Sequence, residues 1–308
     1  MLVKFIFMTV VAVAVSLPSA LATPVRCTLK KLVVFGDSFS ESGNVYKLSN
    51  KTWPPPFYYK GRFSNGPAWP DYVVKARNYQ VVNYAYGGAT TDSDLVQGLT
   101  GQNSNILVPG FLQQLDIYAS KYAQRAIAES VFVINFQGND FFFDISLDPS
   151  AVVDRIHTGI KRLVSMGARR ILVIQNQNIG LIPYAITNTS LADAYSKKAK
   201  EEQAEFGIFA AEVKEEYGSL AGPGSLRTCN FHDKEKAKIA FFDLTKFFAY
   251  LYQPKELRRL GITDVTHGCV SIDYKNVCKN PGKHFFWDAF HPSAKIQMEI
   301  AKAVLNWL

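Results

Sequence analysis

Ser38 is the first residue along the chain whose type and position suggest chemistry. It follows the apolar run 32–35, which is typical of a strand buried on both faces, and then Gly36 and Asp37. Ligands of open α/β sheets bind where the strands end, so a hydroxyl at this point is well placed to act as a nucleophile. Gly-Asp-Ser is also ordinary turn chemistry, and this stretch alone leaves both interpretations open.

Asp288 and His291 are candidates for activating this hydroxyl. A serine is a poor nucleophile until a base takes its proton. The two residues lie three apart, just before the last predicted helix. On one tight turn, the carboxylate of Asp288 can hold one ring nitrogen of His291 and leave the other as a base. By itself Asp-x-x-His is a weak signal, and it fits a helix cap beside a surface histidine better. Its position after the fifth predicted strand is what favours catalysis.

Acyl transfer also needs hydrogen-bond donors for the oxyanion of the tetrahedral intermediate. Suitable donors are the backbone N–H groups of Ser38 and Gly88 and the side-chain amide of Asn139, which follow three different predicted strands. Because the carboxyl ends of parallel strands share one edge of the sheet, we expect these donors to meet. We predict that Ser38, Asp288 and His291 are catalytic and that Ser38, Gly88 and Asn139 form the oxyanion hole.

Strands and helices alternate along the chain in a way that would position these residues. Short apolar runs predict strands at 32–35, 81–84, 131–135, 171–174 and 239–243. Helical patterns lie at 69–79, 109–122, 151–166, 190–217, 244–252 and from Pro292 to the end. This alternation predicts an α/β fold with a parallel sheet and helices on both faces. We expect a Ser190/Asp193 capping box on the long helix and an irregular loop over 253–285.

Four segments of the chain resemble, in order, the four sequence blocks of the GDSL esterase/lipase family of SGNH hydrolases. These segments are FGDSFSESGN, NYAYGGAT, QGND and WDAFHPS, and they span residues 32–293. Phe39 stands where the family name has Leu. The resemblance implies a flavodoxin-like three-layer α/β/α sandwich with a five-stranded parallel sheet. It also implies the same roles for Ser38, Gly88, Asn139, Asp288 and His291, with no metal or organic cofactor.

The amino terminus is typical of a secretory signal peptide. Lys4 precedes the apolar run 5–15, and Ala20-Leu21-Ala22 has the small-x-small form of a cleavage site. We expect residues 1–22 to be this signal peptide and 23–308 to be one SGNH hydrolase domain, secreted and extracellular. The alternative is a membrane anchor that is retained; the run is short for a span, so we expect no stable membrane anchor.

Composition limits the classes of partner. The chain has 308 residues, of which 34 are Lys or Arg and 26 are Asp or Glu, giving a net charge of +8. No dense basic block with interleaved aromatic residues occurs, so the charge indicates attraction to anionic surfaces such as acidic polysaccharide rather than nucleic acid. We expect a monomer whose partner is an ester substrate.

Four cysteines in a secreted chain suggest two disulfides, with three possible pairings. Cys269 and Cys278 close a short loop, the pairing that costs least chain entropy, and this leaves Cys27 with Cys229. A zinc site of His267, Cys269 and Cys278 is conceivable, but its spacing matches no common zinc pattern. Two sequons predict glycosylation on the surface, at Asn50 and Asn188.

The substrate is indicated only indirectly. The loop 52–70 is rich in proline and aromatic residues and either walls a substrate cleft or is a packed surface loop. We expect substrate contacts from Trp53, Tyr58, Trp69 and Phe141; the triplet 141–143 lines an acyl pocket or belongs to the core. The resemblance, to secreted fungal acetylesterases and plant-type lipases, implies cleavage of short acyl esters, acetyl above all, on plant cell-wall carbohydrate through an acyl-enzyme. The alternatives are a lipid-directed lipase, phospholipase or acyltransferase, and a catalytically silent binding protein.

Overall fold

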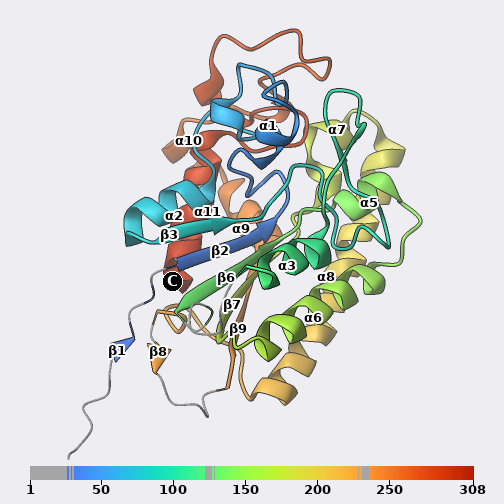
Figure 1. Cartoon of the computed structure of the whole chain (residues 1–308). Coiled ribbons are helices and arrows are strands. Elements are labelled where there is room, and N and C mark those ends of the chain that lie inside the picture. Colours follow the sequence, from blue (N-terminus) through green and yellow to red (C-terminus); the bar gives the residue numbers. More distant parts are fainter. Residues whose placement is uncertain are drawn as a thin grey trace, which may run out of the picture.

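A parallel five-stranded sheet runs through the computed structural model, in the spatial order β3-β2-β6-β7-β9 (Figure 1). The structure describes residues 26–27, 29, 31–121, 127, 129–227, 229–230 and 236–308. The strands are β2 (Lys31–Gly36), β3 (Gln80–Asn83), β6 (Ser130–Asn135), β7 (Arg170–Gln175) and β9 (Lys238–Asp243). All five predicted strands are confirmed, and their order is that of flavodoxin-like sheets.

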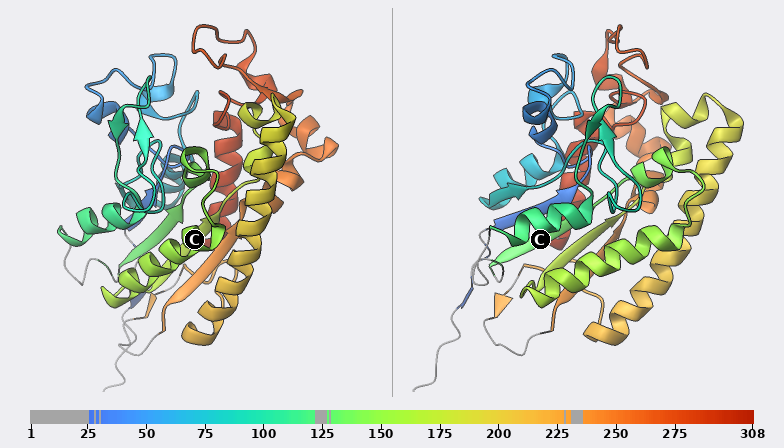
Figure 2. Two further views of the ribbon diagram at one scale, coloured as in Figure 1. Left: turned by 90° about the vertical axis from the view of Figure 1, so that its right-hand side faces the viewer. Right: turned by 45° about the vertical axis from the view of Figure 1, so that its right-hand side comes forward.

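Helices cover both faces of the sheet and complete a three-layer α/β/α sandwich (Figures 1 and 2). One layer contains α2 (Trp69–Arg77), α9 (Leu244–Leu251) and α11 (Ala294–Trp307). The other contains α3 (Phe111–Ala119), α6 (Pro149–Ser165) and the second half of α8 (Thr189–Tyr217). The predicted fold class is therefore confirmed.

The core divides into two apolar clusters, one on each face of the sheet. In β2, Val34 packs in the cluster that holds Trp69 of α2, and its neighbour Phe35 packs with Phe111 of α3. These four side chains are fully buried. Successive strand residues point to opposite faces, and both faces are covered, so the strands are continuous apolar runs rather than alternating ones.

The segment predicted to be an irregular loop over 253–285 contains regular structure, so that prediction is wrong. It holds α10 (Pro254–Leu260), β10 (Asp264–Gly268), η3 (Pro281–Lys283) and β11 (His284–Phe286), and β10 pairs with β11 in parallel. Other short elements at the same end of the sheet are α1 (Asn44–Leu48), η1 (Tyr59–Gly61), β4 (Leu99–Thr100), β5 (Ile106–Leu107), α5 (Asn139–Phe143), η2 (Ile179–Leu181) and α7 (Pro183–Ile186). Elements this short show too few periods to be recognised from sequence.

Two predicted helix starts differ from the structure. The long helix α8 begins at Thr189, and its N-cap is Asn188, whose side chain accepts a hydrogen bond from Leu191 N at 3.2 Å. Asn is among the best N-cap residues, which explains why the Ser190/Asp193 capping box does not form. The last helix begins at Ala294, two residues after the predicted Pro292.

The cysteine predictions are tested in part. Cys269 and Cys278 form a disulfide. Cys27 lies opposite Cys229 in the antiparallel pair of β1 (Arg26–Cys27) and β8 (Cys229–Asn230), but these two side chains lie outside the described residues. The predicted signal peptide, residues 1–22, also lies outside them. None of the helices in the described ranges has the length and hydropathy needed to cross a membrane.

Candidate active site

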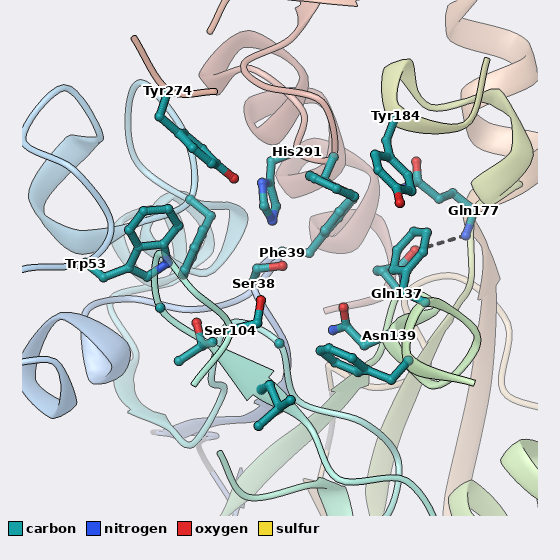
Figure 3. Close-up of a pocket in the computed structure, with 18 of the residues that line it drawn as sticks. Ser38, Phe39, Trp53, Ser104, Gln137, Asn139, Gln177, Tyr184, Tyr274 and His291 are labelled. Carbon is teal, nitrogen blue, oxygen red and sulfur yellow. Dashed lines mark hydrogen bonds between the residues drawn. The ribbon is translucent and has the colours of Figure 1, made fainter. Parts of the chain in front are cut away.

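A pocket of about 290 Å³ opens at the carboxyl ends of the strands (Figure 3). It lies beside β2 and β6, neighbouring strands at the point where the strand order reverses. This switch point is where ligands of doubly wound sheets bind. Residues lining the pocket include Ser38, Phe39, Trp53, Phe63, Gly88, Thr100, Ser104, Gln137, Asn139, Phe142, Phe143, Gln177, Tyr184, Tyr195, Tyr274, Phe290 and His291.

Ser38 lies in a tight turn directly after β2 and is 9% exposed. The turn is held by the carboxylate of Asp37, which accepts hydrogen bonds from Phe39 N at 3.0 Å and from Gln137 N at 2.5 Å. Only glycine fits at position 36, because a Cβ there would lie 2.6 Å from a carbonyl oxygen at the end of β6. These contacts fix the Ser38 hydroxyl at the wall of the pocket.

Asp288 and His291 share one turn before α11, as predicted. The backbone N–H groups of Phe290 and His291 donate to Asp288 Oδ1 at 2.8 and 2.7 Å, and Trp287 N donates to the His291 carbonyl at 2.7 Å. The His291 ring nitrogen Nδ1 lies 2.8 Å from Asp288 Oδ1 and 2.7 Å from Oδ2. Because Nδ1 is held by the carboxylate, Nε2 is the ring nitrogen that remains for chemistry.

The His291 ring lies over Ser38 at the centre of the pocket (Figure 3). The Ser38 hydroxyl has no hydrogen-bond partner within the part of the chain that the structure describes, so it remains available to the ring. The ring itself is surrounded by Phe63, Phe39 and Phe290, with centroids 5.1, 6.2 and 6.1 Å away. The imidazole is therefore packed among aromatic rings on several sides.

Gly88 lines the same pocket. Its φ is +86°, a left-handed conformation that favours glycine, and a Cβ would overlap the carbonyl oxygen of Leu99. Among the described residues, no acceptor is bonded to Gly88 N or to Ser38 N. Two free N–H groups on one pocket wall can receive a developing oxyanion.

Asn139 opens the short helix α5, after Gly138 in a left-handed conformation. Its Nδ2 donates to the Ala89 carbonyl at 2.9 Å and to Asp37 Oδ2 at 3.3 Å. The amide therefore lies at the pocket, tied to the turns that carry Ser38 and Gly88. To donate to an oxyanion, it would give up the longer of these contacts, the one to Asp37.

Two buried carboxylates near Ser38, Asp37 and Asp288, have pKa values that are shifted in opposite directions. Burial raises the pKa of Asp37 to about 7, although hydrogen bonds from two backbone N–H groups oppose this effect. For Asp288 burial also favours the neutral acid, but the charge of His291 and hydrogen bonds from His291 and Tyr58 outweigh it and hold the pKa below its ordinary value. Asp288 is thus the charged partner that a histidine base requires.

The aromatic residues predicted to contact substrate are mostly elsewhere. Trp53 lines the pocket. Trp69 and Phe141 are fully buried in the core, and Tyr58 is 5% exposed with its hydroxyl bonded to Asp288. These three side chains do not line the pocket, so the prediction that they bind substrate is not supported.

Other aromatic residues line the pocket. The sequence left open whether the triplet 141–143 lines an acyl pocket or belongs to the core, and the structure divides it. Residues 142 and 143 lie on the face of α5 that carries Asn139 and line the pocket, while residue 141 lies in the core. The remaining rings come from segments far apart in the sequence, and no local pattern would have brought them together. They are Tyr184, Tyr195, Tyr274 and Phe290.

The described residues include no group of three or more His, Cys, Asp or Glu side chains placed to hold a metal ion. The groups that the pocket offers for chemistry include the hydroxyl of Ser38, the imidazole of His291 and the amide of Asn139. A hydroxyl beside a carboxylate-held imidazole, with two free N–H groups nearby, is the arrangement required for acyl transfer.

Comparison with curated proteins finds relatives over most of the chain. A thermolabile hemolysin of Vibrio parahaemolyticus is 25% identical over 90% of this chain, which spans 63% of the hemolysin. A GDSL esterase/lipase of Arabidopsis thaliana is 25% identical over 85% of this chain and 82% of its own length. A phosphatidylcholine-sterol acyltransferase of Aeromonas hydrophila is 24% identical over 81% of this chain and 68% of its own length.

Solved structures of lipolytic proteins are also similar. A G-D-S-L family protein of Veillonella parvula has a TM-score of 0.46 at 13% identity, covering 89% of this chain and 94% of that one. An acetylxylan esterase of Geobacillus stearothermophilus has a TM-score of 0.40 at 16% identity, covering 90% of this chain and 93% of that one. These TM-scores are too low to carry an argument about substrate.

The sequence model of GDSL-like lipases and acylhydrolases matches residues 32–304, which include β2 from its second residue, every strand after it and all residues that line the pocket. This match covers the turn of Ser38 as well as the turn of Asp288 and His291. The chain therefore belongs to the GDSL-like lipase/acylhydrolase family and is a carboxylic ester hydrolase.

Proposed function

We propose that the enzyme cleaves short-chain acyl esters through an acyl-enzyme, with Ser38 as nucleophile and Asp288 and His291 as its partners. The observation that carries this proposal is the meeting of Ser38, the carboxylate-held His291 and the free N–H of Gly88 in one pocket. Asn139 lies at the same pocket and is proposed as the third oxyanion donor.

The proposed reaction has two halves. His291 takes the proton of Ser38 while its oxygen attacks the ester carbonyl, and the imidazolium then gives the proton to the leaving alcohol. Asp288 keeps the histidine in the tautomer with Nε2 free and stabilises the imidazolium. The oxyanion is held by Ser38 N, Gly88 N and Asn139, and water releases the acid from the acyl-enzyme by the same proton path.

The size of the pocket supports short acyl groups. Ligand pockets commonly measure about 300–1,000 Å³, so a volume of about 290 Å³ is at the lower end of this range. A small pocket favours an acetyl or butyryl group over a palmitoyl chain.

Carbohydrate is the alcohol part that we propose, as in esters of plant cell walls. The rings of Trp53 and Tyr274 contact each other at 5.0 Å on one wall of the pocket, and such rings offer flat apolar faces to a sugar. The net charge of +8 favours approach to acidic polysaccharide.

A lipid substrate is the second candidate. Two relatives are named as a hemolysin and as an acyltransferase of phosphatidylcholine and sterol. Phe143 lies at the pocket with 38% of its surface exposed, which is the kind of side chain that contacts lipid. Activity on micelles that rises at the interface would favour this candidate over the first.

Secretion is part of the proposal. Residues 1–22 have the form of a signal peptide. Asn50 and Asn188, the two sequon residues, are exposed, as glycosylated side chains must be. The disulfide between Cys269 and Cys278 fits an oxidising compartment.

The test is a series of p-nitrophenyl esters from acetate to palmitate, run beside acetylated xylo-oligosaccharides, with Ser38→Ala as control. We expect the highest kcat/KM for acetate or butyrate, release of acetate from the oligosaccharides, and labelling of the wild type alone by a fluorophosphonate. A preference for palmitate would overturn the substrate proposal. Equal labelling or equal hydrolysis by Ser38→Ala would overturn the mechanism, and a wild type that is neither labelled nor active would indicate a silent binding protein.

A further inference from the structure

The carboxylate of Asp288 has a second partner besides the histidine. Tyr58 lies in the segment between α1 and α2, 230 positions before Asp288, and its hydroxyl donates to Asp288 Oδ2 at 2.5 Å. His291 Nδ1 meets the same carboxylate, so the acid is held between a phenol and an imidazole. The sequence offered no reason to place Tyr58 here.

The Tyr58 hydroxyl is fixed by the packing of its ring. The ring lies edge-on to Trp287 at 5.9 Å and to Phe63 at 6.2 Å. Tyr58 and Trp287 belong to a small apolar cluster that also contains Cys269 and Val270. Tyr58 is only 5% exposed, so water has little access to replace its hydroxyl. A buried, immobile donor of this kind gives a short, charge-assisted hydrogen bond.

We propose that Tyr58 is a positioning residue of the active site, acting through Asp288. Its hydroxyl keeps Asp288 charged and oriented, so that His291 is held with Nε2 toward Ser38. Tyr58 does not line the pocket and so does not act on the substrate directly. The inference rests on the proposed function, because it assigns Tyr58 a part in the same proton transfer.

The electrostatics give the direction of the effect. The titratable groups that face the Asp288–His291 pair are Tyr58 and Tyr274, near Asp288, and Asp37, near His291. Of these, only Tyr58 donates a hydrogen bond to the pair. Without it, Asp288 loses one of the hydrogen bonds that hold the pKa of this carboxyl below its ordinary value. The carboxylate then interacts more strongly with the ring that it holds, which changes the pH dependence of the reaction.

The test is Tyr58→Phe, which keeps the ring in its cluster and removes only the hydroxyl. We expect kcat to fall about tenfold with KM almost unchanged, and the acid limb of kcat/KM to move to higher pH by about half a unit to one unit. Tyr59→Phe is the matched control, since its hydroxyl has no hydrogen bond in the described part of the chain, and it should behave as wild type. If the maximum of kcat/KM is lower in Tyr58→Phe but the acid limb of its pH profile stays at the pH of the wild type, the role of Tyr58 is merely structural and the inference is overturned.

A double-variant cycle makes the test independent of folding losses. Tyr58→Phe leaves the buried charge of Asp288 with one hydrogen bond fewer, and Asp288→Asn removes this charge. If Tyr58→Phe alone fails to fold, the double variant should therefore still fold. If Tyr58 acts through Asp288, removing its hydroxyl in the Asn background changes kcat by less than about twofold. An equal loss in both backgrounds would refute the coupling. Equal activity of wild type and Ser38→Ala would instead sink the proposed function, whatever Tyr58 does.

Discussion

Asn139→Ala should remove most of the turnover and leave substrate binding almost unchanged. The amide is aimed at the pocket by two acceptors, the Ala89 carbonyl at 2.9 Å and Asp37 Oδ2 at 3.3 Å. The second distance is beyond the usual 2.7–3.2 Å, so this contact is weak and easily exchanged for an oxyanion. The donor is thus poised for the transition state, where the oxygen carries charge, more than for the ester itself.

The magnitude follows from these contacts. Loss of one oxyanion donor lowers kcat by about 10²–10³. Because Asn139 has to release Asp37 before it can donate, we expect the lower end, about a hundredfold. The Ala89 carbonyl also loses its donor, which should lower the free energy of unfolding by about 1 kcal/mol, too little to unfold the chain.

The assay is steady-state hydrolysis of p-nitrophenyl acetate, with active sites counted by a fluorophosphonate. Ser104→Ala is the matched control, since Ser104 lines the same pocket and is no part of the proposed machinery. Asn139→Asp should be at least as impaired as Asn139→Ala, because a carboxylate repels the oxyanion. Retention of more than about a third of wild-type kcat in Asn139→Ala would refute the reasoning.

Three further perturbations test other parts of the structure. Gly88→Ala places a Cβ against the Leu99 carbonyl at a φ of +86°, so we expect a loss of at least about 1–2 kcal/mol in thermal unfolding and a large loss of kcat. Burial raises the pKa of Glu202 to about 8, from 4.5. Its stabilising contribution is therefore complete below pH 4.5 and is lost as pH rises to about 8. In urea unfolding, the free energy of unfolding of Glu202→Gln relative to wild type should be higher at pH 8 than at pH 5. Replacing Cys269 and Cys278 by Ser opens a loop of about ten residues, and the free energy of unfolding in urea should fall by about 2–3 kcal/mol.

The sheet and the order of its polar turns were predictable from sequence because their signals are local. The inner strands β2, β6 and β7 are buried on both faces, so each is an almost uninterrupted apolar run, and each run ends in glycine or polar residues. The edge strand β3 is partly exposed and was recognised by its two valines. The parallel topology then places the ends of these strands at one edge. For that reason Ser38, Gly88, Asn139 and His291 could be assigned to a single site before any contact was known.

Helix phase was harder to predict where helices are short or partly polar inside. The sequence of α5 does not indicate which of its three phenylalanines faces the core, because five residues make little more than one turn of helix. Glu202 of α8 is buried and bonded to Asn176 at 2.9 Å, although its type predicts exposure. In both cases the packing of neighbouring elements, and not the sequence of the helix, makes the choice.

The sequence by itself determined the strands, the turn in which Asp288 meets His291, and the family. Only the tertiary structure decided that Tyr58 lies behind Asp288 and that Tyr274 closes one wall of the pocket. These contacts join segments separated by most of the chain, and each depends on how irregular loops pack on one another. No periodic pattern records such packing, because it arises only once the sheet has brought the loops to the same edge.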